Sequence, residues 1–114
     1  MEVTTYASEK INLGEFTLED FVLLLFPKGK KKMRECALVI LKELKEKPQT
    51  ISEIVEKHKL KRGTAYDAAN FMQRLGIIDR EAKYAPARLS SKFPLALERL
   101  AFWYRQTFGF KRKI

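Results

Sequence analysis

Apolar residues recur at helical spacing along most of the chain, and capping residues mark where several helices should begin. Thr17 with Asp20 three residues later predicts an N-terminal cap for a short helix over residues 18–26. The next pattern, over residues 32–47, is apolar on every side at its centre. A helix of that kind needs partners on more than one face, so we expect it to be the central helix of a small bundle.

Two further helical patterns meet at a short basic turn. Thr50 and Glu53 form a capping box for the first, which should span residues 51–58. The second should span residues 62–75, with Gly76 as its left-handed C-cap. It carries a stripe of apolar residues at helical spacing: Ala65, Ala69, Met72 and Leu75.

Strand-like runs and one more helix complete the pattern. Residues 77–81 and 83–89 predict two strands around a tight turn, in which Pro86 is tolerated only at a sheet edge. Ser90 or Ser91 should cap a last helix that reaches about Thr107. Residues 1–12 are expected to form a strand or an extended arm.

This order of elements predicts a mainly α fold with a small β-wing, the winged helix-turn-helix. The expected organisation is a single compact domain in three parts: an acidic N-terminal extension with a short helix and a basic loop (1–31), a winged helix-turn-helix core (32–92), and a C-terminal helix of dimerisation type with a basic tail (93–114). In this layout the second helix of the helix-turn-helix usually lies in the major groove of DNA.

Charge supports a phosphate-rich partner. The net charge is +9 over 114 residues, which favours binding to nucleic acid. It is unevenly placed: residues 1–26 hold one lysine against five carboxylates, a net −4, so the other 88 residues carry +13. The acidic segment either forms a second functional surface or covers part of the basic one.

Other classes of function find little support in the composition. Cys36 is the only cysteine and His58 the only histidine, so we expect no disulfide, no metal site and no cofactor. No nucleophile with a base and no glycine-rich phosphate loop can be identified, so we do not expect an enzyme. The longest apolar runs have six residues, which predicts neither a signal peptide nor a membrane span, and therefore a cytoplasmic protein, associated with the nucleoid in a prokaryote.

The segments LKRGTAYDAANFMQRLGIID and YAPARLSSKFPLALERL resemble those of small winged-helix regulators of the MarR and PadR kind, of an archaeal type. The resemblance covers roughly residues 33–105 and implies a transcription regulator that binds double-stranded DNA as a homodimer. It also implies that the helix over residues 62–75 reads base edges while the wing contacts the DNA backbone. The short wing and Pro86 depart from the family pattern and argue against insertion into the minor groove.

Five residues of the helix over 62–75 are candidates for reading DNA. Arg62 either pairs with guanine or contacts a phosphate or solvent, and Gly63 leaves room for the backbone to approach. The Thr64 hydroxyl is suited to a phosphate. Tyr66 should face outward, against a thymine methyl or a sugar, or else pack on the wing. Asn70 can form the two-bond pairing with adenine.

Basic residues around this helix are expected to contact phosphates: Lys59, Lys61, Arg74, Arg80, Lys83 and Arg88. In the run PKGKKKMR, Lys30, Lys31 and Lys32 form either a phosphate clamp or a solvated loop. Asp67 would be repelled by phosphates. It could accept a hydrogen bond from cytosine, but we expect it to pair with Arg62 or Arg74 instead.

The last helix carries more apolar surface than one face needs. One stripe contains Phe93, Leu97, Leu100, Ala101, Tyr104 and Phe108, while Leu95, Phe102 and Trp103 lie off it. The stripe predicts a homodimer interface, and its alternative role is to pack on residues 16–26.

The leading hypothesis is therefore a double-stranded DNA-binding regulator or chromatin-associated factor, and two rival functions remain open. In one, the chain is a winged-helix module that binds a protein partner through its N-terminal segment or its C-terminal helix, around Phe102, Trp103 and Phe110. In the other, Tyr66, Tyr84 and Trp103 stack on the bases of a single-stranded nucleic acid.

Overall fold

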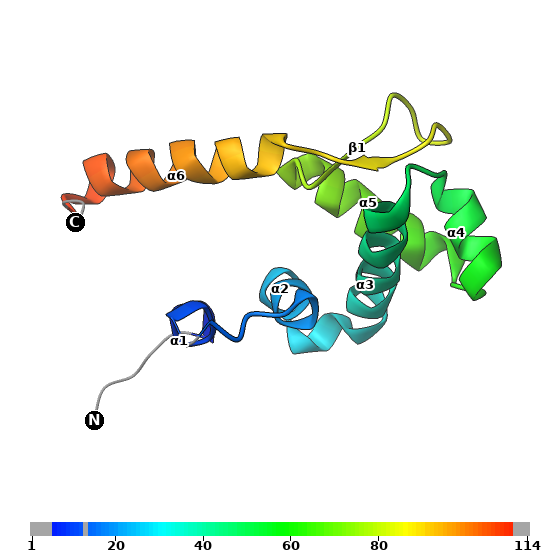
Figure 1. Ribbon diagram of the computed structural model, residues 1–114, viewed down its shortest axis with the longest axis horizontal. Coiled ribbons are helices and arrows are strands. Elements are labelled where there is room, and N and C mark those ends of the chain that lie inside the picture. The colour runs from blue at the N-terminus through cyan, green and yellow to red at the C-terminus, as the bar shows by residue number, and fades with distance from the viewer. Residues whose placement is uncertain (1–5, 13, 111–114) are drawn as a thin grey trace.

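The computed structural model describes residues 6–12 and 14–110, and over these the protein is mainly helical with a small two-stranded antiparallel sheet (Figure 1). The elements follow in the order α1 (Tyr6–Asn12), α2 (Leu18–Leu25), the 3₁₀ turn η1 (Lys28–Lys30), α3 (Lys31–Glu46), α4 (Ile51–His58), α5 (Arg62–Leu75), β1 (Ile78–Asp79), β2 (Arg88–Leu89) and α6 (Lys92–Phe108). No helix within the described ranges is both long enough and apolar enough to cross a bilayer.

Helix α3 is the central helix, as its apolar pattern predicts. It contacts α2, α4, α5 and β2, and Ala37 and Ile40 at its middle are fully buried. Small side chains on α5, including Ala65 and Ala69, are also fully buried, so the backbones of α3 and α5 can approach closely. The core therefore lies around α3 and α5 and is completed by α4, by Val22 and Phe26 from α2 and its end, and by Ile78 of β1, whereas α6 contributes no buried residue to it.

The predicted helix boundaries are confirmed where capping chemistry is local. Thr17 with Asp20, and Thr50 with Glu53, form complete capping boxes at the starts of α2 and α4. Gly76 ends α5 with φ of 85°, a left-handed conformation that side chains disfavour. A Cβ at Gly76 would also lie 3.4 Å from Cβ of Lys92, so the start of α6 packs close to this turn.

Two expectations need correction. Residues 6–12 form helix α1 rather than a strand or arm, while residues 1–5 lie outside the described ranges. The strands are shorter than predicted, and residues 80–87 form a loop instead of a tight turn. The reason is that Ala87 pairs with Gln49: each backbone N–H donates to the other's carbonyl oxygen, at 2.8 and 3.1 Å.

The last helix begins close to where it was predicted. The Ser90 hydroxyl accepts a hydrogen bond from the backbone N–H of Lys92 at 3.1 Å, whereas Ser91, at the N-cap position, makes no side-chain capping bond. Pro94 falls in the first turn, where its missing N–H leaves no helical bond unmade.

A charge cluster joins α3 to the end of α4. Oε1 of Glu43 lies 2.7 Å from Nζ of Lys57 and 2.7 Å from Nε2 of His58. Gln49 donates to the backbone carbonyl of Glu43 at 3.0 Å and to its carboxylate at 3.3 Å. The hydrogen bond from Lys57, followed by that from His58, lowers the pKa of Glu43 to about 2.

This cluster predicts how stability depends on pH. Because the pKa of Glu43 falls from an ordinary 4.5 to about 2, its contribution to the free energy of unfolding is complete above pH 4.5 and is lost as the pH falls to about 2. We expect Glu43→Gln to be less stable than the wild type at pH 7 and equally stable near pH 2 in urea unfolding. Glu46→Gln, at the exposed end of the same helix, is the control. Parallel pH profiles for wild type and Glu43→Gln would contradict this role.

Candidate nucleic-acid interface

A tight turn sets α4 and α5 against each other. Lys59 ends α4 in a left-handed conformation, with φ of 54°, and the backbone N–H of Leu60 donates to the carbonyl of Val55 at 3.0 Å. Lys61 then returns to an extended conformation and α5 starts at Arg62. Because the alanine stripe of α5 faces the core, the opposite side is exposed. That side carries Gly63, Asp67, Asn70 and Arg74, whereas Arg62 lies in line with the buried Ala65 and Ala69 and is exposed as the first residue of the helix.

The basic run after α2 lies beside the start of α5. One surface hollow is lined by Lys30, Lys31 and Lys32 together with Thr64 and Asp67 of α5. A neighbouring hollow is lined by Lys32, Lys59, Lys61 and Thr64, with Glu35 at its edge. The clamp and the turn, predicted separately, thus form one surface. We call it the basic rim. Its members are the five lysines that line these hollows, Lys30, Lys31, Lys32, Lys59 and Lys61, together with the exposed Arg62, which follows Lys61 in sequence.

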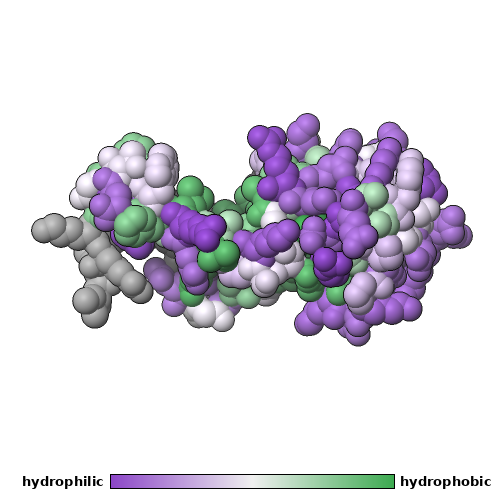
Figure 2. Space-filling view, turned by 90° about the horizontal axis from the view of Figure 1, so that it is seen from above, coloured by the Kyte–Doolittle hydropathy of each residue, from purple (hydrophilic) through white to green (hydrophobic). Residues whose placement is uncertain are grey.

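Figure 2 shows how hydropathy is divided over the molecule. The end formed by α4, α5 and the loop after β1 is largely hydrophilic, whereas apolar side chains gather toward α2 and α6. The charged and apolar surfaces are therefore separate, and each is available to a different partner.

Tyr66 does not face outward as expected. It is 6% exposed, its ring lies edge-on to Tyr84 with centroids 6.0 Å apart, and Nζ of Lys83 lies 5.4 Å from its centroid. The alternative in which Tyr66 packs on the loop after β1 is confirmed. A direct contact between its ring and a base edge is excluded by this burial, and its hydroxyl has no hydrogen-bond partner within the described structure.

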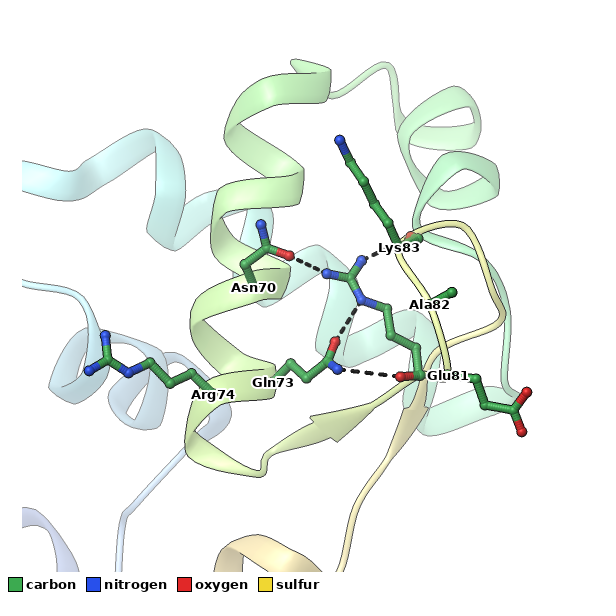
Figure 3. A pocket seen from close by; sticks show the side chains of 7 residues that line it. Asn70, Gln73, Arg74, Glu81, Ala82 and Lys83 are labelled. Carbon is green, nitrogen blue, oxygen red and sulfur yellow. Dashed lines mark hydrogen bonds between the residues drawn. The ribbon is translucent and has the colours of Figure 1, made fainter.

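Arg80 is not an exposed cation either, because only 6% of it is accessible. Its Nε donates to Gln73 at 2.7 Å, one Nη donates to the carbonyl of Lys83 at 3.2 Å, and the other donates to Oδ1 of Asn70 (Figure 3). Gln73 in turn donates to the carbonyl of Arg80 at 3.3 Å. Arg80 therefore fastens the loop over residues 80–87 to α5, and its burial lowers its pKa.

Other side chains have partners that the sequence did not predict. Arg62 donates to the Ser52 hydroxyl at 3.2 Å, and Asp67 forms no ion pair with Arg62 or Arg74 in the described ranges, so the expected internal pair is wrong. Arg88 pairs with Asp79 at 3.2 Å. Asn70 can bind adenine with two bonds only by sharing its Oδ1 with Arg80.

Gln73 was missed as a residue of this face. It follows Asn70 by three positions on α5, so the two amides lie on one side of the helix, and both bind Arg80. The spacing was visible in the sequence, but their shared partner lies on the following loop.

The predicted stripe on α6 is mostly unburied. Only Phe93 is half-buried; its ring lies edge-on to Phe21, with centroids 5.8 Å apart. Leu97 and Leu100 are 47% and 56% exposed, Ala101 is exposed, and Tyr104 and Phe108 are 51% and 58% exposed. Packing of α6 on residues 16–26 therefore covers only its first turn, and the rest extends away from the core (Figure 1).

An apolar groove of about 510 Å³ opens between α2 and α6, with walls that include Phe16, Phe21, Leu24, Leu97 and Leu100. Beyond it, at the end of α6, four aromatic rings contact one another while each stays more than half exposed: Trp103, Tyr104, Phe108 and Phe110.

No protein-family model matches the chain, and no curated protein matches it either. The resemblance to MarR and PadR regulators therefore stays a prediction. Within the described ranges, no three histidine, cysteine, aspartate or glutamate side chains are grouped so that they could hold a metal ion.

Proposed function

We propose that this protein is a winged helix-turn-helix that binds double-stranded DNA and regulates transcription. The observation that carries the proposal is the convergence of two segments at the start of α5. The clamp lysines 30–32 lie beside the turn that holds Lys59 and Lys61 and is followed by Arg62, and together these residues form the exposed basic rim. Such clustering of cations around an exposed helix favours a polyanion as the ligand.

The order of the elements supports the winged-helix part of the proposal. Helices α4 and α5 are joined by a three-residue turn, and β1 and β2 follow as an antiparallel pair. The bridge between Gln49 and Ala87 also joins the segment before α4 to the segment before β2. The small sheet is therefore bonded to the chain that precedes α4 as well as to the chain that follows α5. The loop over residues 80–87 would be the wing.

In this arrangement α5 enters the major groove. Arg62, at its start, can donate two parallel hydrogen bonds to guanine, which is worth about 1 to 3 kcal/mol of discrimination. To do so, Arg62 would have to break its hydrogen bond to the Ser52 hydroxyl and donate to the base edge instead. The rim lysines then contact phosphates on the flanks, with Thr64 between them, and fix the register without reading sequence.

We further propose that a second copy of the chain covers α6. A two-fold axis near Leu100 would run the two α6 helices antiparallel, so the first half of one helix meets the second half of the other. The two halves are complementary: the first half of α6 forms a wall of the apolar groove with α2, and the second half carries Tyr104 and Phe108. Each copy would then supply both a groove and the aromatic side chains that fill it.

A dimer of this kind also fits the proposed ligand. Two α5 helices related by a two-fold axis bind successive major grooves when they lie about 34 Å apart, one turn of the duplex. Pairing through α6, which extends away from α4 and α5 in Figure 1, leaves both basic rims free.

The proposal is tested by fluorescence anisotropy of a labelled random 30-mer duplex, and of its single strand, from 50 to 300 mM salt. We expect tighter binding to the duplex, with log K falling steeply as log salt rises. After selection of a preferred site, Arg62→Ala should relax sequence preference, whereas Lys83→Ala should weaken binding to all sequences alike. If both variants lower the affinity by the same factor for every DNA sequence, Arg62 does not read a base.

A protein-binding module is the second candidate function, favoured by the exposed aromatic cluster at the end of α6. Its complex would survive high salt, because apolar burial is not screened by ions, whereas phosphate contacts are. Absence of duplex binding at 50 mM salt would favour this function.

A further inference from the structure

A polar cleft lies between α5 and the loop over residues 80–87, on the same side of the molecule as the exposed face of α5 (Figure 3). Its volume is about 520 Å³, and the side chains around it include Asn70, Gln73, Arg74, Arg80, Glu81 and Lys83. Asn70 and Arg74 stand one helical turn apart on α5, and Lys83 projects from the loop opposite them.

The guanidinium of Arg80 in this cleft is a buried positive charge without a counter-charge. Its hydrogen-bond acceptors are the amides of Asn70 and Gln73 and a backbone carbonyl, all neutral. It makes no ion pair with a carboxylate anywhere in residues 6–12 and 14–110. A buried charge normally has a partner of opposite sign, because desolvation is costly without one.

The surroundings of Arg80 add positive charge rather than balance it. Arg74 and Lys83 are both exposed at the edges of the cleft. Glu81 is the one carboxylate among the residues that line it, and in Figure 3 its side chain points away from the guanidinium of Arg80. In the same view the side chain of Arg74 also points away from Arg80, so an anion that entered would meet Arg80 and Lys83, and would meet Arg74 once that side chain turned inward.

Hydrogen-bond donors remain free for such an anion. A guanidinium has five N–H groups, and Arg80 uses three of them, so two are left. The side-chain N–H₂ of Asn70 is also available, because its oxygen is the atom that binds Arg80. The free N–H groups of Arg80 and Asn70, with cationic side chains nearby, suit a ligand in which several acceptor oxygens surround one central atom.

We propose that this cleft binds a phosphate group, with Arg80 at its floor, Lys83 beside it on the loop, and Arg74 turning inward from α5 to complete the site. The inference rests on the proposed function where the phosphate belongs to the DNA backbone: a duplex lying along α5 would bring a phosphodiester to this cleft. A small free phosphate ester offers the same chemistry, and the experiment below separates the two sources.

The test follows the Nε–H resonance of Arg80 in ¹⁵N-labelled protein by NMR. Inorganic phosphate and the 30-mer duplex are titrated separately at constant ionic strength, with sodium chloride as the blank. We expect both ligands, and not chloride, to shift this resonance to saturation. Arg74→Gln and Lys83→Gln, which alter exposed side chains, should each weaken phosphate binding about three- to fivefold, as for a solvent-exposed charge pair.

Arg99→Gln on α6 and Lys42→Gln on α3 are the matched controls, and both should leave phosphate binding unchanged. If the duplex shifts the backbone amide resonances of residues 62–67 while neither ligand shifts the Arg80 resonance, the proposed phosphate site in the cleft is refuted and the proposed DNA binding stands. If phosphate moves the resonance and the duplex binds nowhere, the cleft stands with a free phosphate ester as its ligand, and the proposed DNA binding fails. Equal shifts with chloride would overturn the site.

Discussion

Replacing Leu97 and Leu100 of α6 by glutamate is expected to give a folded monomer whose affinity for a two-site duplex is lower by at least about a hundredfold. Both side chains line the apolar groove and are about half exposed, so the core of the protomer does not depend on them. In the paired state each glutamate would lie against apolar side chains of the other copy, which is costly for an unpaired charge. A monomer also lacks the second DNA-binding surface, and binding through two linked surfaces raises the affinity by roughly 10² to 10⁴-fold.

Sedimentation velocity measures the oligomeric state, and anisotropy with one-site and two-site duplexes measures the affinity. The matched control is Leu95→Glu with Phe102→Glu, two exposed apolar residues seven positions apart on the other side of α6. This control should remain a dimer and bind the duplex as the wild type does. A wild-type protein that sediments as a monomer at all concentrations, or a control that alone becomes monomeric, would refute pairing through the groove-facing stripe.

Replacing Lys30, Lys31 and Lys32 together by glutamine should weaken duplex binding on the order of 100-fold near 0.15 M salt, whatever the DNA sequence. The three residues lie beside the start of α5 and belong to the basic rim. If each neutralises one phosphate, the slope of log K against log salt should become shallower by about 2.7, since each contact contributes about 0.9.

The change in slope separates a contact from a merely local effect. A matched triple variant, Lys42, Lys45 and Lys47 to glutamine, removes the same charge from the other end of α3, where these side chains are exposed. It should change the slope much less than the clamp variant does. If the two triple variants weaken binding equally, net charge alone would account for the effect and the clamp would not be a contact site.

The helices of this fold could be predicted because their signals are local. Thr17, Thr50 and Gly76 act on backbone groups within four residues, so their spacing alone places the ends of α2, α4 and α5. The burial of Cys36 and its neighbours on α3 follows in the same way from an apolar pattern that leaves no solvent-facing side.

The loop over residues 80–87 could not be predicted, because its conformation depends on contacts distant in sequence. Arg80 turns inward to two amides on α5, and Ala87 pairs with Gln49 rather than extending the ladder with β1. Tyr66 is buried because Tyr84 and Lys83 of the same loop cover it. For Arg80 and Tyr66 the residue type was compatible with an exposed position, and contacts with distant parts of the chain buried both side chains.

The placement of the clamp lysines was also hidden from the sequence. Lysines 30–32 lie at the start of α3, about thirty residues before Thr64 and Asp67 of α5, and only the packing of α3 against α5 brings them together. The composition indicated a phosphate-rich partner, but not which basic residues share a surface.

The acidic residues of α1 and α2 lie apart from the turn between α4 and α5, and this separation affects how the molecule approaches a charged partner. Glu9 and Glu19 belong to these two helices, which Figure 1 places on the other side of α3 from α4. Because residues 1–26 carry a net charge of −4 and the rest of the chain +13, the uneven distribution gives each protomer an electric dipole moment. In the field of a polyanion the dipole experiences a torque that turns the start of α5 forward before contact, so encounters in a productive orientation become more frequent as the ionic strength falls.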